Sequence, residues 1–504
     1  MVRSRCTLVP DTFDLDLRPE PSTSLLPFDL CPLTFRILPL ALVLTICFAS
    51  VSAQSGTAFD RAAAQRDTLA LLKELVALDT QNPPGNEVIV ARHLDRFLKG
   101  VPGIETRILD PGDSRANFIA RLRATKPTRR AVLVMGHMDV VGADLTKWTS
   151  PPFQPTERDG YLYGRGTIDD KGALAATAVA MRLLATRRDS LDRDIILLGT
   201  AAEEGGDQGI DTVIAKHFDL IKDAEFALNE GGRVRARDGK VFSINIQVTE
   251  KISYVVTATA RGTSGHGSVP LPDNPIAALS RALARVHDSK QRARVSDISR
   301  AYFGGLAKVE QDAAMRQAMQ TIGSARAQAE IDKAAAVLSR DPVHNAVLRD
   351  AASITMVNGG IRANVIPSEA TATLNARILP DSDIRAFIAD LNRIGGEKHV
   401  TFAIQREPQK APPISGTKTP LYLAMESVGA AMAPDAAVVP MLSTGATDGA
   451  ALRAAGIPTY GILPLPLEQE DELRMHADNE RVPIASLGWG TEYLYRVLST
   501  VAMR

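Results

Sequence analysis

Five short clusters of acidic and histidine residues are prominent in this chain, most of them beside glycine. They are Gly136-His137-Met138-Asp139, the segment 164–172 with Asp169-Asp170, Glu203-Glu204-Gly205-Gly206, Asn229-Glu230-Gly231-Gly232 and Met475-His476-Ala477-Asp478. Each alone is weak evidence, because short motifs arise by chance. The Glu203-Glu204 pair carries more weight, since adjacent carboxylates at the end of a buried strand repel each other unless a cation offsets them.

The cysteines limit which groups can bind a metal. All three, Cys6, Cys31 and Cys47, fall within the first fifty residues. The rest of the chain therefore offers only histidine and carboxylate ligands, a set that suits zinc and also accepts Co²⁺ or Mn²⁺. Two ions about 3.5–4 Å apart need a bridging carboxylate. Such a site also needs a further carboxylate that is not a ligand and can act as a base.

The elements around the clusters predict how they are positioned. Ala131–Met135 and Asp194–Thr200 are short runs typical of buried strands, and Gly172–Leu184 has the pattern of a helix. Strands that alternate with helices indicate an α/β sandwich. Ligands bind at the carboxyl ends of the strands in such sheets, which is where most of the clusters fall.

A second unit is indicated from about residue 250 onward. Tyr254–Ala260 and Ala370–Ile378 have the pattern of half-buried strands, and Pro275–Val286 that of an amphipathic helix. We therefore predict an α+β domain inserted into the α/β domain. The expected division is 1–53 signal peptide, 54–250 catalytic domain, 251–407 inserted domain and 408–504 the rest of the catalytic domain.

The bulk charge and the N-terminus bear on partners and location. Lys+Arg and Asp+Glu are equal at 58 each, which argues against nucleic acid as a partner. An apolar run over 37–49 precedes Val51-Ser52-Ala53, a pattern typical of a cleaved export signal. We expect a secreted or periplasmic protein that does not associate with the membrane after cleavage. A retained membrane anchor is the alternative, and residues 1–35 are acidic enough to suggest an over-extended gene start.

The motifs GHMDVV, YGRGTIDDKG, AEEGG, NEGG, SGHGS and MHADNE occur in an order that resembles the di-zinc metallopeptidase family of aminoacylase, glutamate carboxypeptidase and carboxypeptidase S. The resemblance covers about residues 60–500 and is nearest to carboxypeptidase S-like members. It implies a zinc-peptidase α/β/α sandwich with an inserted α+β (ferredoxin-like) lid that also forms the dimer interface.

The resemblance also implies a role for each matching residue. Glu203 corresponds to the general base, and Asp139 orients the ring of His137. Asp169 bridges the two zinc ions, and the peptide after it is expected to be cis. The implied metal ligands are His137, Asp169, Glu204, Glu230 and His476. Two alternatives stay open: Asp139 merely caps a turn, or Asp170 is the ligand in a register shifted by one.

Three further residues are implied in the inserted domain. His266 stabilises the oxyanion in the active site of the partner subunit, which implies a homodimer built through the lid. Arg377 and Asn364 bind the substrate, with Arg377 suited to a carboxylate. Position 375 is Asn where the family commonly has Asp, and this puts the polar network of that strand in doubt.

Together these observations predict a zinc-dependent hydrolase that cleaves a peptide or N-acyl amide bond next to a free carboxylate. A dipeptidase or small N-acyl deacylase is the alternative within the family. A non-catalytic receptor or scaffold is a remote alternative, because it would not need the Glu203-Glu204 pair.

The export signal makes a direct prediction. Mature protein from the native host should begin near Gln54 and so contain no cysteine. N-terminal sequencing measures this, and a protein that retains residues 1–53 would replace the cleaved signal with an anchor.

Overall fold

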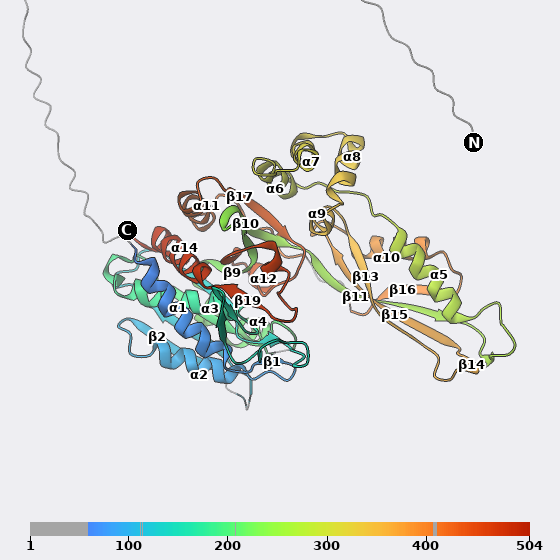
Figure 1. Ribbon diagram of the computed structural model, residues 1–504, viewed down its shortest axis with the longest axis horizontal. Coiled ribbons are helices and arrows are strands. Elements are labelled where there is room, and N and C mark those ends of the chain that lie inside the picture. Colours follow the sequence, from blue (N-terminus) through green and yellow to red (C-terminus); the bar gives the residue numbers. More distant parts are fainter. Residues whose placement is uncertain (1–58, 111, 113, 207, 407–410) are drawn as a thin grey trace, which may run out of the picture. The chain divides into compact units, whose positions relative to one another are not determined.

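The computed structural model describes residues 59–504 except 111, 113, 207 and 407–410, so the predicted signal peptide lies outside the described residues. The described chain contains a mixed eight-stranded sheet (Figure 1). In spatial order its strands are β17 (Ala437–Ser443), β10 (Lys240–Glu250), β18 (Thr459–Leu467), β9 (Ala224–Arg237), β4 (Ala131–His137), β8 (Ile195–Thr200), β3 (Asn117–Leu122) and β2 (Ile104–Leu109).

The strand β4 is apolar almost to its end because both of its faces are covered. In β4, Val132 and Val134 belong to one hydrophobic core, while Ala131, Leu133 and Met135 belong to a second core on the opposite face. Alternation between two cores leaves no position for a polar side chain until the strand ends at His137. The predicted α/β fold is confirmed.

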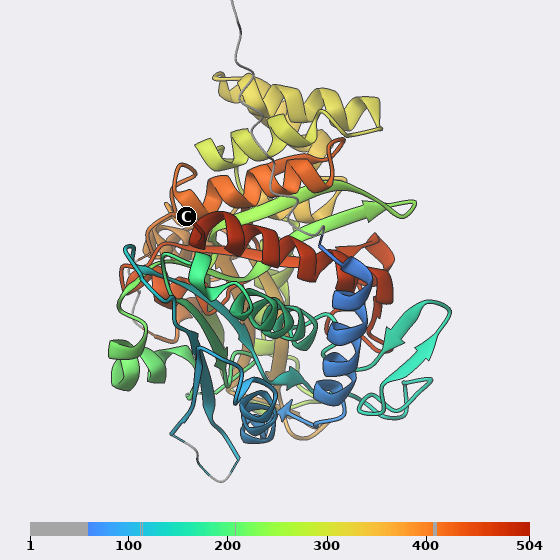
Figure 2. The same cartoon turned by 90° about the vertical axis from the view of Figure 1, so that its left-hand side faces the viewer.

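Helices cover the two faces unequally. The larger core lies under five helices, three of which (α1, α3 and α14) pack against one another (Figure 2). These helices are α1 (Arg61–Val76), α2 (Glu87–Leu98), α3 (Lys171–Ala185), α11 (Pro420–Met432) and α14 (Ile484–Ala502). The opposite face is covered by α4 (Ile210–His217) and α12 (Gly449–Ala454).

A four-stranded antiparallel sheet follows β10 along the chain. Its order is β13 (Ala351–Gly359), β15 (Glu369–Ile378), β11 (Ile252–Arg261) and β16 (Val400–Ile404). The helices α5 (Pro275–Asp288) and α10 (Ile384–Gly395) pack on it and share its own hydrophobic core. Each helix begins at a side-chain cap, Asn274 for α5 and Asp383 for α10.

The helices between α5 and β13 pack elsewhere. They are α6 (Asp297–Leu306), α7 (Ala313–Ser324), α8 (Gln328–Leu338) and α9 (Pro342–Val347), here called the helical insert. Their core includes Tyr302 and Phe303 together with Val439 and Met441 of β17, an edge strand of the large sheet. The insert thus packs against the edge strand β17 of the large sheet. The sequence pattern had assigned it to the α+β unit.

The remaining elements are short. They are the pair β1 (Gln81–Asn82) and β5 (Val140–Val141), the pair β12 (Gly265–His266) and β14 (Val365–Ile366), the three-stranded sheet of β6 (Thr156–Arg158), β7 (Tyr161–Tyr163) and β19 (Arg481–Pro483), the helix α13 (Gln469–Glu472), and the 3₁₀ helices Arg188–Ser190 and Phe218–Leu220.

Strand register brings the acidic clusters to one edge of the large sheet. β4 pairs in parallel with β8, with His137 opposite Thr200, so that Glu203 and Glu204 follow close beyond. β9 also runs parallel to β4, with Leu228 opposite Val134, which carries Glu230 to the same edge. β9 does not end at Glu230. It continues to Arg237 and forms a long hairpin with β10 that the sequence analysis missed.

Close packing at Gly172 generates a stability prediction. A Cβ at this position in the first turn of α3 would lie 2.3 Å from the backbone oxygen of Thr167. Helix propensity alone would favour alanine by about 0.8–1 kcal/mol. The steric clash outweighs this gain in helix propensity, so we expect Gly172→Ala to lower the free energy of unfolding by about 1–3 kcal/mol.

Gly416→Ala is the matched control, because nothing lies within 4 Å of its added Cβ. Denaturant unfolding of both variants measures the difference. A Gly172→Ala protein as stable as the parent would show that the loop 164–170 can move away from α3 freely.

Candidate metal centre

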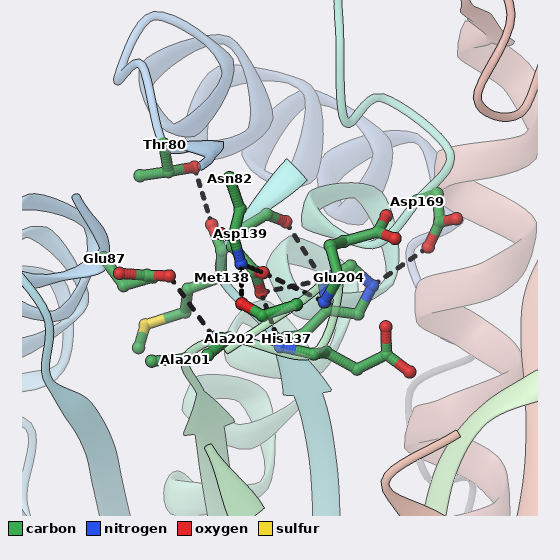
Figure 3. A network of polar contacts seen from close by, with 12 residues as sticks. Thr80, Asn82, Glu87, His137, Met138, Asp139, Asp169, Ala201, Ala202 and Glu204 are labelled. Atoms are coloured by element: carbon green, nitrogen blue, oxygen red, sulfur yellow. Dashed lines mark hydrogen bonds and ion pairs between the residues drawn. The ribbon is translucent and has the colours of Figure 1, made fainter. Parts of the chain in front are cut away.

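Four of the predicted ligands come together at the carboxyl edge of the large sheet. The ligand atoms of His137, Asp169 and Glu204 all lie within 4.8 Å of one another. His137 Nε2 is 3.0 Å from Asp169 Oδ1 (Figure 3). His476 Nε2 lies 2.9 Å from Asp169 Oδ2 and 3.0 Å from Glu204 Oε1. Asp169 therefore stands between the two imidazoles, as a bridging carboxylate would.

The buried side chain of Asp139 contacts three residues of this site. Its buried carboxylate lies 3.5 Å from His137 Nδ1 and accepts hydrogen bonds from the backbone N–H groups of Glu203 (3.2 Å) and Glu204 (3.0 Å). His137 Nδ1 also lies 3.0 Å from the Asp139 carbonyl oxygen. Asp139 thus contacts the ring of His137 and the backbone of both glutamates, an arrangement that a partner of a metal ligand commonly has.

The cluster is rich in partly buried negative charge. Burial, together with nearby carboxylates that include Asp169, raises the pKa of Glu230 to about 8. The pKa of Glu203 is raised well above its usual range, mainly by burial and then by Glu230 and Asp448. Hydrogen bonds to Asp169 and Glu204 raise the pKa of His476 to about 10, and the two histidines lower that of Asp169 despite its burial. This charge pattern fits a divalent cation, which favours ionised carboxylates and neutral imidazoles.

Asp169 belongs to the ligand cluster, whereas its neighbour Asp170 does not. The peptide between them is cis, as expected from the resemblance. Asp170 is not part of the ligand cluster: its carboxylate is buried, has no hydrogen-bond partner among the described residues, and would lie 2.4 Å from a Cβ at Gly136. Only glycine fits at position 136, immediately before His137. The geometry thus favours Asp169 as the ligand in the cluster and gives no support to the shifted register.

Several positioning residues were missed by sequence reasoning. Asn82 donates through Nδ2 to Asp139 Oδ2 (2.8 Å) and to the carbonyl oxygen of Gly205, and it accepts from Arg115 Nη2 at 2.9 Å. Glu87, fully buried, pairs with Arg115 at 3.1 Å and accepts from the backbone N–H of Ala202. The loop Asn82-Pro83-Pro84-Gly85 was the only visible signal, and nothing in it indicated a partner.

A cavity of about 1440 Å³ opens over the cluster. Its lining includes Asp169, Glu203, Glu204, Glu230, His476 and Arg377. Arg377, on β15, donates through Nε to Asn375 Oδ1 at 2.8 Å, so the asparagine at 375 preserves a partner for this guanidinium. His266 and Asn364 are exposed, and neither lies among the residues that line this cavity in the described chain.

Comparison with known proteins identifies the family. The model of peptidase family M20/M25/M40 matches residues 133–500, well over half of the chain. The chain belongs to this family. The family resemblance predicted from the motifs is therefore confirmed, and with it the prediction of an enzyme, a hydrolase of amide bonds.

Individual relatives cover most of the chain. The mouse N-fatty-acyl-amino acid synthase/hydrolase PM20D1 is 25% identical over 76% of this chain and 77% of its own length. The Dictyostelium discoideum protein named probable carboxypeptidase S-like 2 is 27% identical over 73% and 71%. The M20 family metallo-carboxypeptidase Sso-CP2 from Sulfolobus solfataricus superposes with a TM-score of 0.64 at 17% identity, covering 86% of this chain and 99% of its own. This last similarity supports the fold.

One observation bears on the membrane. Across residues 59–504, apart from the few positions left undescribed, no helix has the length and apolarity needed to cross a bilayer.

The Asn82 network generates a prediction about activity. Asn82→Ala removes two hydrogen bonds that hold Asp139 and the loop after β8, and it leaves Arg115 without one acceptor. We expect hydrolysis to fall by roughly 10–100-fold, the usual cost of losing a partner of a metal-site residue.

Asn86→Ala is the control in the same loop, since Asn86 precedes α2 without a side-chain capping bond. Steady-state rates and melting temperatures of both variants check the prediction. Equal losses in the two variants would assign the effect to the loop as a whole and not to Asn82.

Proposed function

We propose that this chain is a zinc-dependent metallopeptidase or amidohydrolase that cleaves a peptide or N-acyl amide bond next to a free carboxylate, as a carboxypeptidase or N-acyl-amino-acid hydrolase. One observation carries the proposal: the ligand cluster and the Arg377 guanidinium line the same cavity. Metal ligands and a carboxylate-binding group in one cavity define where the scissile bond and its neighbouring carboxylate would lie.

The metal assignment rests on the donor set. We propose that His137, Glu230, Glu204 and His476 hold two zinc ions bridged by Asp169, with Co²⁺ or Mn²⁺ as alternatives. When bound, zinc acidifies water and polarises the amide carbonyl. Glu203 then accepts the proton of the attacking water and delivers it to the leaving amine nitrogen. Its carboxylate suits this role because burial and its acidic neighbours raise its pKa.

Arg377 is proposed to bind the substrate carboxylate. Its Nη1 atom is buried and has no hydrogen-bond partner among the described residues, while Nε is held by Asn375. A guanidinium fixed on one side presents its remaining donors in a geometry that matches a carboxylate. Asn364 is proposed as a substrate contact on the family resemblance alone.

Cavity size favours a substantial acyl or peptide group over a dipeptide. Ligand cavities commonly measure about 300–1,000 Å³, whereas this one measures about 1440 Å³. Apolar side chains of the helical insert line part of it: Leu306, Met319, Val343 and Val347. A dipeptidase or small N-acyl deacylase stays the alternative. A scaffold without metal would gain nothing from the buried carboxylate cluster.

The domain division and the dimer are further proposals. Residues 59–504 cluster as one compact unit, so the boundaries at 251 and 407 rest on the separate core of the smaller sheet. Met356 and Val357 on its edge strand β13 are 57% and 61% exposed. An apolar open edge of this kind supports a homodimer formed through the lid. Secretion or periplasmic export is proposed on the N-terminal pattern alone.

A substrate screen tests the proposed function. The zinc-loaded mature protein is given N-acyl-amino acids of increasing acyl length, dipeptides and longer peptides, each with a free or an amidated carboxyl terminus. We expect the free-carboxylate forms with larger acyl or peptide groups to give the highest kcat/KM, and chelation to abolish activity until zinc is restored. Best rates on dipeptides or acetylated amino acids would favour the alternative, and full activity without metal would refute the proposal.

The role of Glu203 yields a prediction that separates base from ligand. Glu203→Gln should lower kcat by at least about 10²-fold, the usual contribution of a general base, while metal content stays at the parent's value. Glu204→Gln is the matched control and should lose metal. Elemental analysis and turnover are measured on both, and loss of metal from Glu203→Gln would mean that base and ligand are exchanged.

His266 is predicted to act in the partner's active site. Its Nδ1 accepts from the backbone N–H of Ser268 at 3.2 Å, which leaves the ring proton on Nε2 as a donor for an oxyanion. His266→Ala should therefore retain metal and lower kcat. Co-expressed His266→Ala and Glu203→Gln subunits should regain activity, because a mixed dimer contains one site with both residues intact. No recovery in isolated mixed dimers would place His266 outside the partner's site.

A further inference from the structure

The buried carboxylate of Glu480 is bonded to the segment that carries Asp169, but it is not one of the predicted metal ligands. Glu480 is fully buried, and among the described residues its carboxylate accepts hydrogen bonds from the segment that carries Asp169. Oε2 accepts from Arg165 Nη1 at 2.7 Å and from the backbone N–H of Gly166 at 3.1 Å. Oε1 accepts from the backbone N–H groups of Ile168 at 2.7 Å and Asp169 at 3.2 Å.

These bonds matter because the segment has no regular structure of its own. Residues 164–170 connect β7 to α3 and are neither helix nor strand. Buried backbone N–H groups need acceptors, and here one carboxylate supplies acceptors for three of them. The Glu480 backbone oxygen also accepts from the N–H of Gly164 at 3.0 Å. Glu480 therefore fixes the path of the chain up to and including the backbone of Asp169.

Arg165 ties the same segment to His476. Its Nη1 pairs with Glu480, and its Nη2 donates to the carbonyl oxygens of Ala477 (3.1 Å) and Gly142 (3.4 Å). Ala477 directly follows His476 in the chain. The guanidinium is almost fully buried and lies 5.2 Å from the Trp148 ring. The two residues, here called the Arg165–Glu480 clamp, thus connect the backbone around Asp169 with the backbone around His476.

We propose that Glu480 is a positioning residue of the metal centre: through the Arg165–Glu480 clamp it sets the distance and orientation of the Asp169 carboxylate relative to His476. Glu480 touches neither metal nor substrate and acts only through Asp169 and His476. The inference rests on the proposed function, in which these two residues hold the metal ions. Partners of metal ligands typically change metal affinity or activity by about 10–100-fold when removed.

Glu480→Gln is the test variant, because it keeps the shape and turns one acceptor oxygen into a donor that faces backbone N–H groups. The matched control is Asp471→Asn. Asp471 is also fully buried and pairs with an arginine, Arg481, at 2.7 Å, but it makes no hydrogen bond to residues 164–170. Both substitutions remove a buried, paired carboxylate, so both should lower the melting temperature.

The first measurement is hydrogen–deuterium exchange in the metal-free proteins. The amides of Gly166, Ile168 and Asp169 should exchange faster in Glu480→Gln, and at the parent's rate in Asp471→Asn. The second is zinc affinity by competition with a chelator. It should fall by about 10–100-fold in Glu480→Gln and stay near the parent's in Asp471→Asn, with kcat lowered more than KM is raised.

Parental zinc affinity and kcat in a folded Glu480→Gln protein would overturn the proposal, whatever happens to amide exchange. Equal losses of affinity in Glu480→Gln and Asp471→Asn would also overturn it, since the effect would then be general destabilisation. If Glu480→Gln does not fold, Glu480→Asp decides with the same readouts, because it keeps the charge and withdraws the oxygens from the amides. A parent that binds no zinc, or is fully active without it, would refute the proposed function itself and the inference with it.

Discussion

Electrostatic repulsion between carboxylates at one edge of the large sheet is the constraint on which the rest of the site depends. Asp169, Glu203, Glu204 and Glu230 line one cavity, and burial removes much of the water that would screen them. Burial first, and then the neighbouring carboxylates, raise the pKa values of Glu203 and Glu230, while Asp169 and Glu204 make close contacts with histidine. A divalent cation is the physical solution that leaves every carboxylate ionised.

Holding like charges together requires anchors outside the cluster, and the structure supplies them through hydrogen bonds to backbone. Asp139 accepts the N–H groups of Glu203 and Glu204, and Glu480 accepts that of Asp169. These anchors are themselves buried carboxylates, which is costly unless each is fully bonded. Asn82 and the Arg115–Glu87 pair support Asp139, and Arg165 supports Glu480. Asp169, Glu203 and Glu204 are thus each held through a backbone N–H group, so these anchoring bonds do not use their side-chain oxygens.

The sequence predicted the charged residues of the site better than the residues that hold them in place by hydrogen bonds. His137, Asp169, Glu204 and His476 could be picked out because each sits in a short motif, and the strand predicted over 194–200 is observed over Ile195–Thr200. Asn82 was not, because its partner Asp139 lies 57 positions away and no local pattern encodes that pairing. Glu480 ends the MHADNE motif, but the motif does not reveal its bond to Asp169, 311 positions away. The Ala-, Arg- and Gln-rich composition of residues 288–350 predicts helices, and the helical insert lies there. Its packing on β17 depends on surface complementarity between distant segments, which periodicity does not report.

The same charge balance bears on substrate binding. The guanidinium of Arg377 interacts electrostatically with the carboxylates of Glu250 and Glu203. Glu250 also accepts a hydrogen bond from the Thr447 hydroxyl and forms an ion pair with Arg453. A substrate carboxylate that approaches Arg377 therefore enters a cavity whose other charged walls are largely acidic. Coulomb repulsion from these groups opposes binding until cations neutralise the cluster. If Arg377 binds the substrate carboxylate as proposed, cations in the cluster would also lower the repulsion that an anionic substrate meets on its way to Arg377. Metal binding and carboxylate recognition would then be coupled through the charges of one cavity.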